Sequence, residues 1–259
     1  MPFTVSHVAA VIPFHRPLAR WRLFTAAVIG SMVPDFGLLW PTHLNRLETH
    51  SMMALLTFCL PVGLVSYWFT QVLIRPAMRE VLPDGPYARL PTDDVNHLLW
   101  QWQHWVPVAL TLLSGAVTHL TWDLFTHEDS RGTRWFPFLN EIGPDLHGHP
   151  TQVTQWLQYA SSGLGLLVVL FAFLLWWWHA RQIGTRPVAR RLGGAERVAW
   201  LGLFALVPLL WVGRDFMHGI RRPVGWFARD VAVDAMRGLV VGLLLVSALL
   251  RLRLTDSGR

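Results

Sequence analysis

The chain of 259 residues is 53% hydrophobic and only 15% charged, whereas a soluble domain usually carries about 25% charged residues. This composition excludes an ordinary soluble domain and predicts a membrane protein. All 22 basic residues are arginines that cluster in short loops between apolar runs, so they indicate membrane orientation and lipid-headgroup contact, and we expect no nucleic-acid partner. The single cysteine, Cys59, excludes an intrachain disulfide and a thiolate metal site.

Two short apolar runs open the chain. FTVSHVAAVIPF and LFTAAVIGSMVP are each too short to cross a bilayer, and the polar stretch HRPLARWR lies between them. They predict an antiparallel helical hairpin with about 12 residues in each arm. The two arms then begin and end at the same level, which places His7 near Asp35. The opening MPFTVSHVAA lacks a basic region and a clear cleavage site, so we expect no removable signal peptide.

Five later stretches are apolar enough to predict membrane-spanning helices, and tryptophans mark several of their ends. They are residues 52–74, 98–120, 161–179, 198–213 and 232–250. The expected fold is all-α, a polytopic membrane helix bundle with about five full spans and the short N-terminal hairpin. We expect residues 1–180 to form a membrane domain that includes an interfacial loop over 121–160. Residues 181–259 would add a two-helix extension to the same bundle.

The arginine distribution predicts the orientation. The side of the membrane that holds the hairpin turn carries about twice as many arginines as the other side. The positive-inside rule makes that side cytoplasmic. The polar motifs of the chain then collect at the extracytoplasmic face.

The stretch VTHLTWDLFTHED carries His119, Asp123 and His127 at intervals of four residues. Such residues form one stripe of a helix, and neighbours about 6 Å apart can share a metal ion. His119 and His127 would lie about 12 Å apart on a straight helix. They can share an ion only if the helix ends near Phe125, and otherwise the stripe serves two ions.

Other candidate ligands fall at the same membrane face. A single histidine at the membrane interface, or a single aspartate that ends a helix, can have a purely structural role. Several ionisable groups gathered in membrane segments are costly, however, and usually mark a functional site. Nitrogen and carboxylate ligands without thiolate suit Zn²⁺, with Mn²⁺ or Fe²⁺ as alternatives. The stripe allows one or two ions, and Asp35 or Asp123 would bridge or orient them if the site is catalytic. The candidate ligands at this face are His7, Asp35, His50, His119, Asp123 and His127. Asp234 and Arg237 instead predict a structural ion pair.

Several motifs resemble a bacterial membrane family of unknown function, domain of unknown function 4184. They are MPFTVSH at the start, GSMVPD at 30–35, ETHS at 48–51, GAVTHLTWDLFTH at 115–127 and LQYASSGLGLL at 157–167. That family is in turn similar to membrane-bound metal-dependent hydrolases and, by the order of its motifs, to zinc-dependent phospholipase C and P1-type nucleases. Those soluble helical enzymes bind three zinc ions and cleave phosphate esters. Their final His-x₃-Glu is missing here, because His147 and His149 have no glutamate four residues on, which favours one or two ions.

The resemblance implies a hydrolase of the bacterial inner membrane that cleaves a phosphate ester of a lipid-borne substrate by metal-activated water. Arg46, Arg131 and Arg134 would contact the phosphate, or would bind anionic membrane lipids without catalysis. Glu128 or Asp129 would support a ligand histidine. The alternatives are a non-catalytic metal-binding membrane scaffold and, less favoured, an ion or solute transporter. The oligomeric state stays open.

Overall fold

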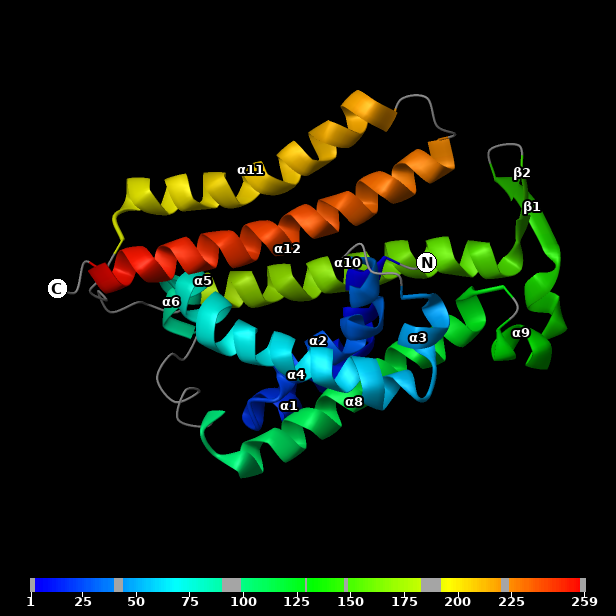
Figure 1. The fold of residues 1–259 in the computed structure, drawn as a ribbon, viewed down its shortest axis with the longest axis horizontal. Coiled ribbons are helices and arrows are strands. Elements are labelled where there is room, and N and C mark those ends of the chain that lie inside the picture. The colour runs from blue at the N-terminus through cyan, green and yellow to red at the C-terminus, as the bar shows by residue number, and fades with distance from the viewer. Residues whose placement is uncertain are drawn as a thin grey trace. The chain divides into compact units, whose positions relative to one another are not determined.

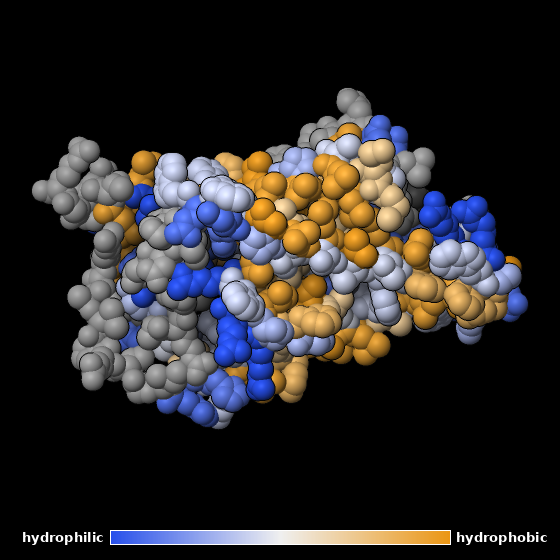
Figure 2. All heavy atoms as spheres, turned by 90° about the horizontal axis from the view of Figure 1, so that it is seen from below, coloured by the Kyte–Doolittle hydropathy of each residue, from blue (hydrophilic) through white to orange (hydrophobic). Residues whose placement is uncertain are grey.

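The structure is a computed structural model that describes residues 3–39, 44–89, 99–128, 130–146, 149–182, 192–219 and 224–256. Within these residues, five helices are long and apolar enough to cross a membrane: Leu55–Val81, Trp102–Thr126, Val153–Gln182, Gly194–Arg214 and Val231–Leu254. Each corresponds to one predicted span, and the predicted all-α multi-pass membrane fold is confirmed (Figure 1). Large apolar side chains remain exposed along these helices, and apolar residues dominate the middle of the face in Figure 2, as lipid contact requires.

The chain forms two compact units. The first unit contains Met1–Phe36, His43–Tyr67 and Gln101–Trp176, and the second contains Gly37–Thr42, Trp68–Trp100 and Trp177–Arg259. Two segments that precede residue 180 therefore pack with the C-terminal helices. The boundary between Phe36 and Gly37 falls inside one short helix.

The N-terminal hairpin is present, but its first arm is not an α-helix. The order of elements is η1 Thr4–Ala10, η2 Ile12–Phe14, α1 His15–Arg20, α2 Phe24–Met32 and η3 Val33–Leu38. The label η denotes a 3₁₀-helix in η1, η2, η3 and η6 and a π-helix in η4 and η5. A Schellman motif ends α1: the amide of Leu23 donates to the carbonyl of Leu18 at 2.8 Å, and that of Arg22 to Ala19 at 3.0 Å. Arg22 takes the left-handed conformation, φ 58°, and the chain reverses there.

The remaining elements of the first unit follow in two groups. Before the first span lies α3 Arg46–His50, and the span opens with the π-helix η4 Leu55–Cys59 and continues as α4 Leu60–Phe69. After α8 Trp102–Thr126 come α9 Arg131–Trp135, η6 Pro137–Asn140, the antiparallel strands β1 Ile142–Leu146 and β2 His149–Gln152, and α10 Val153–Gln182. The loop expected over 121–160 is thus shorter, because α8 extends to Thr126 and α10 begins at Val153.

Two glycines let α2 and α8 approach closely. A Cβ atom on Gly115 would lie 2.7 Å from the carbonyl oxygen of Ala27 and 2.8 Å from the amide nitrogen of Ser31, and one on Gly30 would collide with the carbonyl of Leu112. Small residues at such crossings bring helix backbones together in membranes. This crossing brings the backbone of Ser31 to His119, one turn after Gly115.

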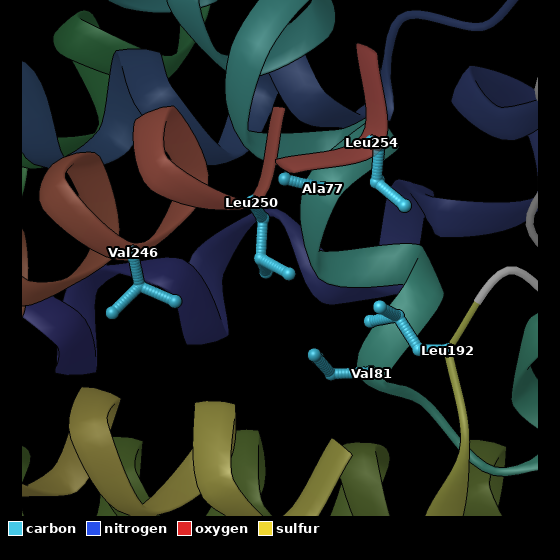
Figure 3. Packing of buried hydrophobic residues seen from close by; sticks show 6 residues of the cluster. All are labelled: Ala77, Val81, Leu192, Val246, Leu250 and Leu254. Carbon is cyan, nitrogen blue, oxygen red and sulfur yellow. The ribbon is translucent and has the colours of Figure 1, made fainter. Parts of the chain in front are cut away.

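The second unit has its own apolar core. Its elements are η5 Thr70–Ile74, α5 Arg75–Val81, α6 Asp84–Arg89, α11 Gly194–Gly219 and α12 Val224–Asp256. The last two pack along each other (Figure 1). The core consists of side chains from α5, the residues before α11, and α12 (Figure 3): Ala77, Val81, Leu192, Val246, Leu250 and Leu254.

The predicted ion pair in α12 is confirmed and is larger than expected. Asp234 accepts a hydrogen bond from Nη1 of Arg237 at 2.7 Å, and its other oxygen accepts one from Nη2 of Arg214 at 2.6 Å. Arg214 lies on α11, so the carboxylate joins both helices of the pair.

Candidate metal centre

Five of the six predicted ligands lie in one buried cluster of the first unit. They come from four elements: His7 from η1, Asp35 from η3, His50 from the end of α3, and His119 and Asp123 from α8. All five side chains are almost completely shielded from solvent. The hairpin prediction that His7 and Asp35 come to the same level agrees with this arrangement, because His119 contacts both residues.

The spacing of the ligand atoms is regular. Nε2 of His50 lies 3.3 Å from Oδ1 of Asp35 and 3.5 Å from Oδ2 of Asp123, and Nε2 of His119 lies 3.6 Å and 3.7 Å from the same two oxygens. Nε2 of His7 lies 3.8 Å from Oδ1 of Asp123. These distances exceed the roughly 2.7–3.2 Å of an N–H···O hydrogen bond. Four ligands around a tetrahedral ion, each about 2.0–2.2 Å from it, lie about 3.3–3.6 Å from one another. The spacing therefore fits atoms that share an ion.

Three ring nitrogens in the cluster lack a hydrogen-bond partner. They are the buried Nε2 atoms of His7, His50 and His119. Nδ1 of His119 lies 2.7 Å from the carbonyl oxygen of Ser31. A carbonyl only accepts, so Nδ1 of His119 is the donor in this contact, and Nε2 is the ring nitrogen directed at the two carboxylates. Buried imidazole nitrogens that face carboxylate oxygens at these distances are placed as the ligands of a metal ion are.

The two carboxylates are placed differently. The hydroxyl of Thr4 donates to Oδ2 of Asp35 at 2.8 Å, which leaves Oδ1 directed at His50 and His119. Asp123 directs Oδ2 at these same two histidines and Oδ1 at His7. Asp123 thus presents one oxygen to each side of the cluster, which is the arrangement that a bridging ligand requires.

The ligand atoms form two possible triads. One is His7, His119 and Asp123, and the other is Asp35, His50 and His119. Both triads include His119, whose ring stacks on the ring of His7 with 3.7 Å between the ring centroids. Since Nδ1 of His119 is bound to Ser31, only Nε2 is available, and it can bind one ion. If two ions bind, only one of them can have His119 as a ligand.

The protonation states suit metal binding. Burial and the neighbouring His119 lower the pKa of His7 to about 3, so its ring is neutral at physiological pH. Burial alone raises the pKa of the Asp35 carboxyl, but His50, His119 and Thr4 outweigh that effect and hold the pKa below its usual range. Neutral imidazole and ionised carboxylate are the forms that bind a metal ion.

His127 lies at the edge of the cluster. Helix α8 ends at Thr126, and His127 is extended, with φ −128° and ψ 139°. Its Nδ1 lies 3.2 Å from the carbonyl oxygen of Asp123 and 3.7 Å from Oδ1 of the same residue. The early helix end is the condition under which His119 and His127 were expected to share an ion, so the 12 Å stripe of a straight helix does not form.

The groups that orient the ligands differ from those expected. Glu128 accepts a hydrogen bond from Gln155 at 2.6 Å rather than supporting a histidine, and Asp129 lies outside the described residues. Thr4 and the Ser31 carbonyl take this role for Asp35 and His119, and the hydroxyl of Thr49 lies 2.7 Å from Nδ1 of His50. A threonine directly before a ligand histidine was a weak signal for the last of these contacts.

The predicted phosphate-binding arginines do not join the cluster in the described structure. Arg131 and Arg134 are exposed on α9, whose N-cap is the hydroxyl of Ser130, and neither forms a hydrogen bond or ion pair with the described ligands. Arg46 opens α3, but its side chain lies outside the described part of the chain.

Comparison with known proteins gives one match. A search of curated proteins and a search of solved structures each found none. A family model described as Domain of unknown function (DUF4184) matches residues 1–248. The match includes α11 and most of α12, beyond the motifs of residues 1–180. The chain therefore belongs to the DUF4184 family.

Proposed function

We propose that the chain is a membrane-embedded metal-dependent hydrolase that cleaves a phosphate ester of a lipid-borne substrate. One observation carries the proposal: three buried histidine nitrogens without hydrogen-bond partners face two carboxylates at 3.3–3.8 Å. The donors are imidazole nitrogens and carboxylate oxygens, which suit Zn²⁺ and also Mn²⁺ or Fe²⁺. One or two ions agree with the two triads that share His119.

The chemistry follows from the residues that would hold the ion. A divalent ion in such a site lowers the pKa of a coordinated water to about 7 and so makes hydroxide available at neutral pH. Asp35 and Asp123 would hold and orient the reacting centre, and Thr4 and Ser31 would fix the directions of Asp35 and His119. The proposal of phosphate-ester cleavage comes from the resemblance of the order of these same candidate ligands to zinc-dependent phospholipase C and P1-type nucleases.

The surroundings of the cluster favour a lipid-borne substrate. Met52 and Met53 follow the ligand His50 and are 69% exposed, and Trp122, next to Asp123, is 50% exposed. Exposed apolar side chains therefore flank two of the ligands in the sequence. A phospholipid or a polyprenyl phosphate would meet these side chains with its apolar chain and present its phosphate to the cluster. In this proposal three arginines neutralise the phosphate or a neighbouring headgroup: Arg46, Arg131 and Arg134.

The arginine distribution supports a site at the extracytoplasmic face of the bacterial inner membrane. Two alternatives use the same residues. A non-catalytic metal-binding scaffold would close the coordination of one ion, and the five convergent side chains are enough to do so. A transporter would need polar groups across the unit, but the packed cluster of Val33, Leu55, Cys59 and Ala116 is apolar, so transport ranks third.

The test of catalysis uses the purified protein in lipid nanodiscs with labelled phospholipids and polyprenyl phosphates. We expect release of phosphate or headgroup by the zinc-loaded wild type and none by the His119→Ala/Asp123→Ala variant. Arg131→Gln/Arg134→Gln should raise KM while the metal content stays at the wild-type level. A wild type that binds metal but cleaves no member of the panel would favour the scaffold. Equal release by wild type and double variant would contradict the proposal.

A further inference from the structure

Helix α10 contacts the start of the chain through the hydroxyl of one serine. Oγ of Ser162 accepts a hydrogen bond from the amide of Phe3 at 3.0 Å, across 159 positions of the sequence. Phe3 is the N-cap residue of η1, which carries the candidate ligand His7, and both η1 and Ser162 belong to the first unit. We propose that Ser162 is a positioning residue for the candidate metal centre, which it acts on by fixing the start of η1. This inference rests on the metal site proposed above.

The Ser162 hydroxyl is oriented for this contact. It donates to the carbonyl oxygen of Gln158, about one turn earlier in α10, at 2.7 Å. A hydroxyl has one donor and two acceptor lone pairs, so its lone pairs are available to the Phe3 amide. The first amides of a helix have no partner within that helix, and inside a membrane no bulk water replaces a lost partner. Ser162 therefore satisfies a group that η1 cannot satisfy itself.

Two further contacts fit η1 to the same face of α10. A Cβ atom on Gly165 would lie 2.7 Å from Cβ of Ser6 and 2.8 Å from its carbonyl oxygen, so the close approach of η1 requires a glycine there. Val169 packs against the buried cluster that includes Val8. Ser162, Gly165 and Val169 are spaced by three and four residues, which places them on one face of a helix. The hydroxyl thus belongs to a face of α10, largely within the motif LQYASSGLGLL, that holds η1.

The start of η1 determines the position of two groups at the metal centre. The carbonyl of Phe3 accepts a 2.7 Å hydrogen bond from the first turn of η1, which joins Phe3 to the helix. Thr4 follows Phe3 directly, and its hydroxyl donates to Oδ2 of Asp35 at 2.8 Å. His7 lies one turn of 3₁₀-helix after Thr4, and its Nε2 is 3.8 Å from Oδ1 of Asp123. A displacement of Phe3 would therefore move both Thr4 and His7.

The expected size of the effect follows from these contacts. Without the Ser162 hydroxyl, the Phe3 amide loses its partner and the first turn of η1 can shift away from α10. Loss of groups that orient metal ligands typically lowers metal affinity about 10–100-fold. We expect a loss of that size, because η1 supplies one ligand, His7, and orients a second, Asp35, through Thr4.

The test compares Zn²⁺ affinity, measured by chelator competition, and the visible spectrum of the Co²⁺-loaded protein in full-length variants. Ser162→Ala should weaken Zn²⁺ binding about 10–100-fold and alter the Co²⁺ spectrum. The matched control is Ser161→Ala. The hydroxyl of Ser161 donates to the same Gln158 carbonyl, at 3.2 Å, and its removal leaves the contact between Ser162 and Phe3 in place. The affinity and spectrum of the control should equal those of the wild type.

A purely structural role of Ser162 gives a different result. Ser162→Ala would then lower the melting temperature of the metal-free protein but leave Zn²⁺ affinity and the Co²⁺ spectrum unchanged, which would overturn the inference. An equal loss of affinity in Ser161→Ala would overturn it as well.

Should Ser162→Ala fail to fold, Ser162→Cys serves in its place, because a thiol is close in size and is a weaker acceptor. It is expected to give an intermediate Zn²⁺ affinity, and wild-type affinity and spectrum in this variant would contradict the positioning role. Metal retention by His119→Ala/Asp123→Ala would instead overturn the metal site itself.

Discussion

Two regions of the molecule bury aspartate beside basic side chains, and they differ in how the negative charge is balanced. In the second unit, Asp234 accepts hydrogen bonds of 2.6 and 2.7 Å from two arginines. In the first, Asp35 and Asp123 lie 3.3–3.8 Å from the Nε2 atoms of three histidines that make no hydrogen bonds there. The three aspartates are similarly buried, so the difference lies in the type of their basic partners and in the distances to them.

The difference has a chemical reason. Arginine is protonated at every physiological pH and has only hydrogen-bond donors, so it both neutralises a carboxylate and satisfies its oxygens. A neutral histidine offers a lone pair, which does not neutralise a carboxylate. The cost of burying an uncompensated charge is large. A bound cation would balance the charge in a region of the second kind, whereas the arginines already balance it in a region of the first kind.

The largest expected effect is a difference in stability between variants of the two regions in the metal-free protein. Asp234→Asn should lower the free energy of unfolding by about 3 kcal/mol, because it leaves two arginines without their carboxylate. Asp123→Asn should leave the free energy of unfolding unchanged or raise it, because it removes a buried charge whose nearest Nε2 atoms lie 3.5–3.8 Å away. Denaturant unfolding in detergent after chelation measures both. Equal losses would show that the two aspartates are balanced in the same way.

A smaller effect is expected from two glycines of α10. A Cβ on Gly165 would lie 2.7 Å from Cβ of Ser6 in η1, whereas one on Gly163 would meet nothing within 4 Å. Gly165→Ala should cost about 1–3 kcal/mol by overpacking and should displace η1 with its ligand His7. Gly163→Ala should be neutral or stabilising by up to about 1 kcal/mol.

The melting temperature and the Zn²⁺ affinity are measured for both glycine variants. We expect Gly165→Ala to lower both, and Gly163→Ala to lower neither. Identical behaviour of the two variants would contradict the close contact between α10 and η1.

The smallest effect concerns a single hydroxyl. Thr4→Val removes the donor to Asp35 and should lower Zn²⁺ affinity about tenfold. Thr118→Val is the control, because that hydroxyl binds the Gly115 carbonyl within α8, although Thr118 adjoins the ligand His119. Isothermal titration distinguishes them, and equal affinities for the two variants would remove Thr4 from the site.

Much of this architecture follows from local patterns in the sequence. Hydropathy predicts the five spans because a bilayer requires long apolar helices. The interval of four residues places His119 and Asp123 on one helix face, and the two short apolar runs at the start predict the hairpin that carries His7 and Asp35. The ends of elements were less predictable: the β-hairpin within 121–160 and the 3₁₀ first arm have no strong periodic signal.

Contacts between distant elements could not be read from the sequence. The Ser31 carbonyl that orients His119 is a backbone group, and every residue has one. Its role depends on the crossing at Gly30 and Gly115, which only the packed helices define. Likewise the spacing of Asp234 and Arg237 predicts their pairing, but Arg214 and Leu38 come from other elements and reach Asp234 and Arg237 through tertiary packing.

The most direct test of the central claim is the metal content of the purified protein, measured by inductively coupled plasma mass spectrometry. Three proteins are compared after identical preparation in zinc-supplemented buffer: wild type, His119→Ala/Asp123→Ala, and His104→Ala. The last is the control, because His104 lies near the other end of α8 and pairs with Tyr67 at 3.1 Å. We predict stoichiometric metal in wild type and His104→Ala and almost none in the double variant. Wild-type metal content in the double variant, or no metal in the wild type, would contradict the account.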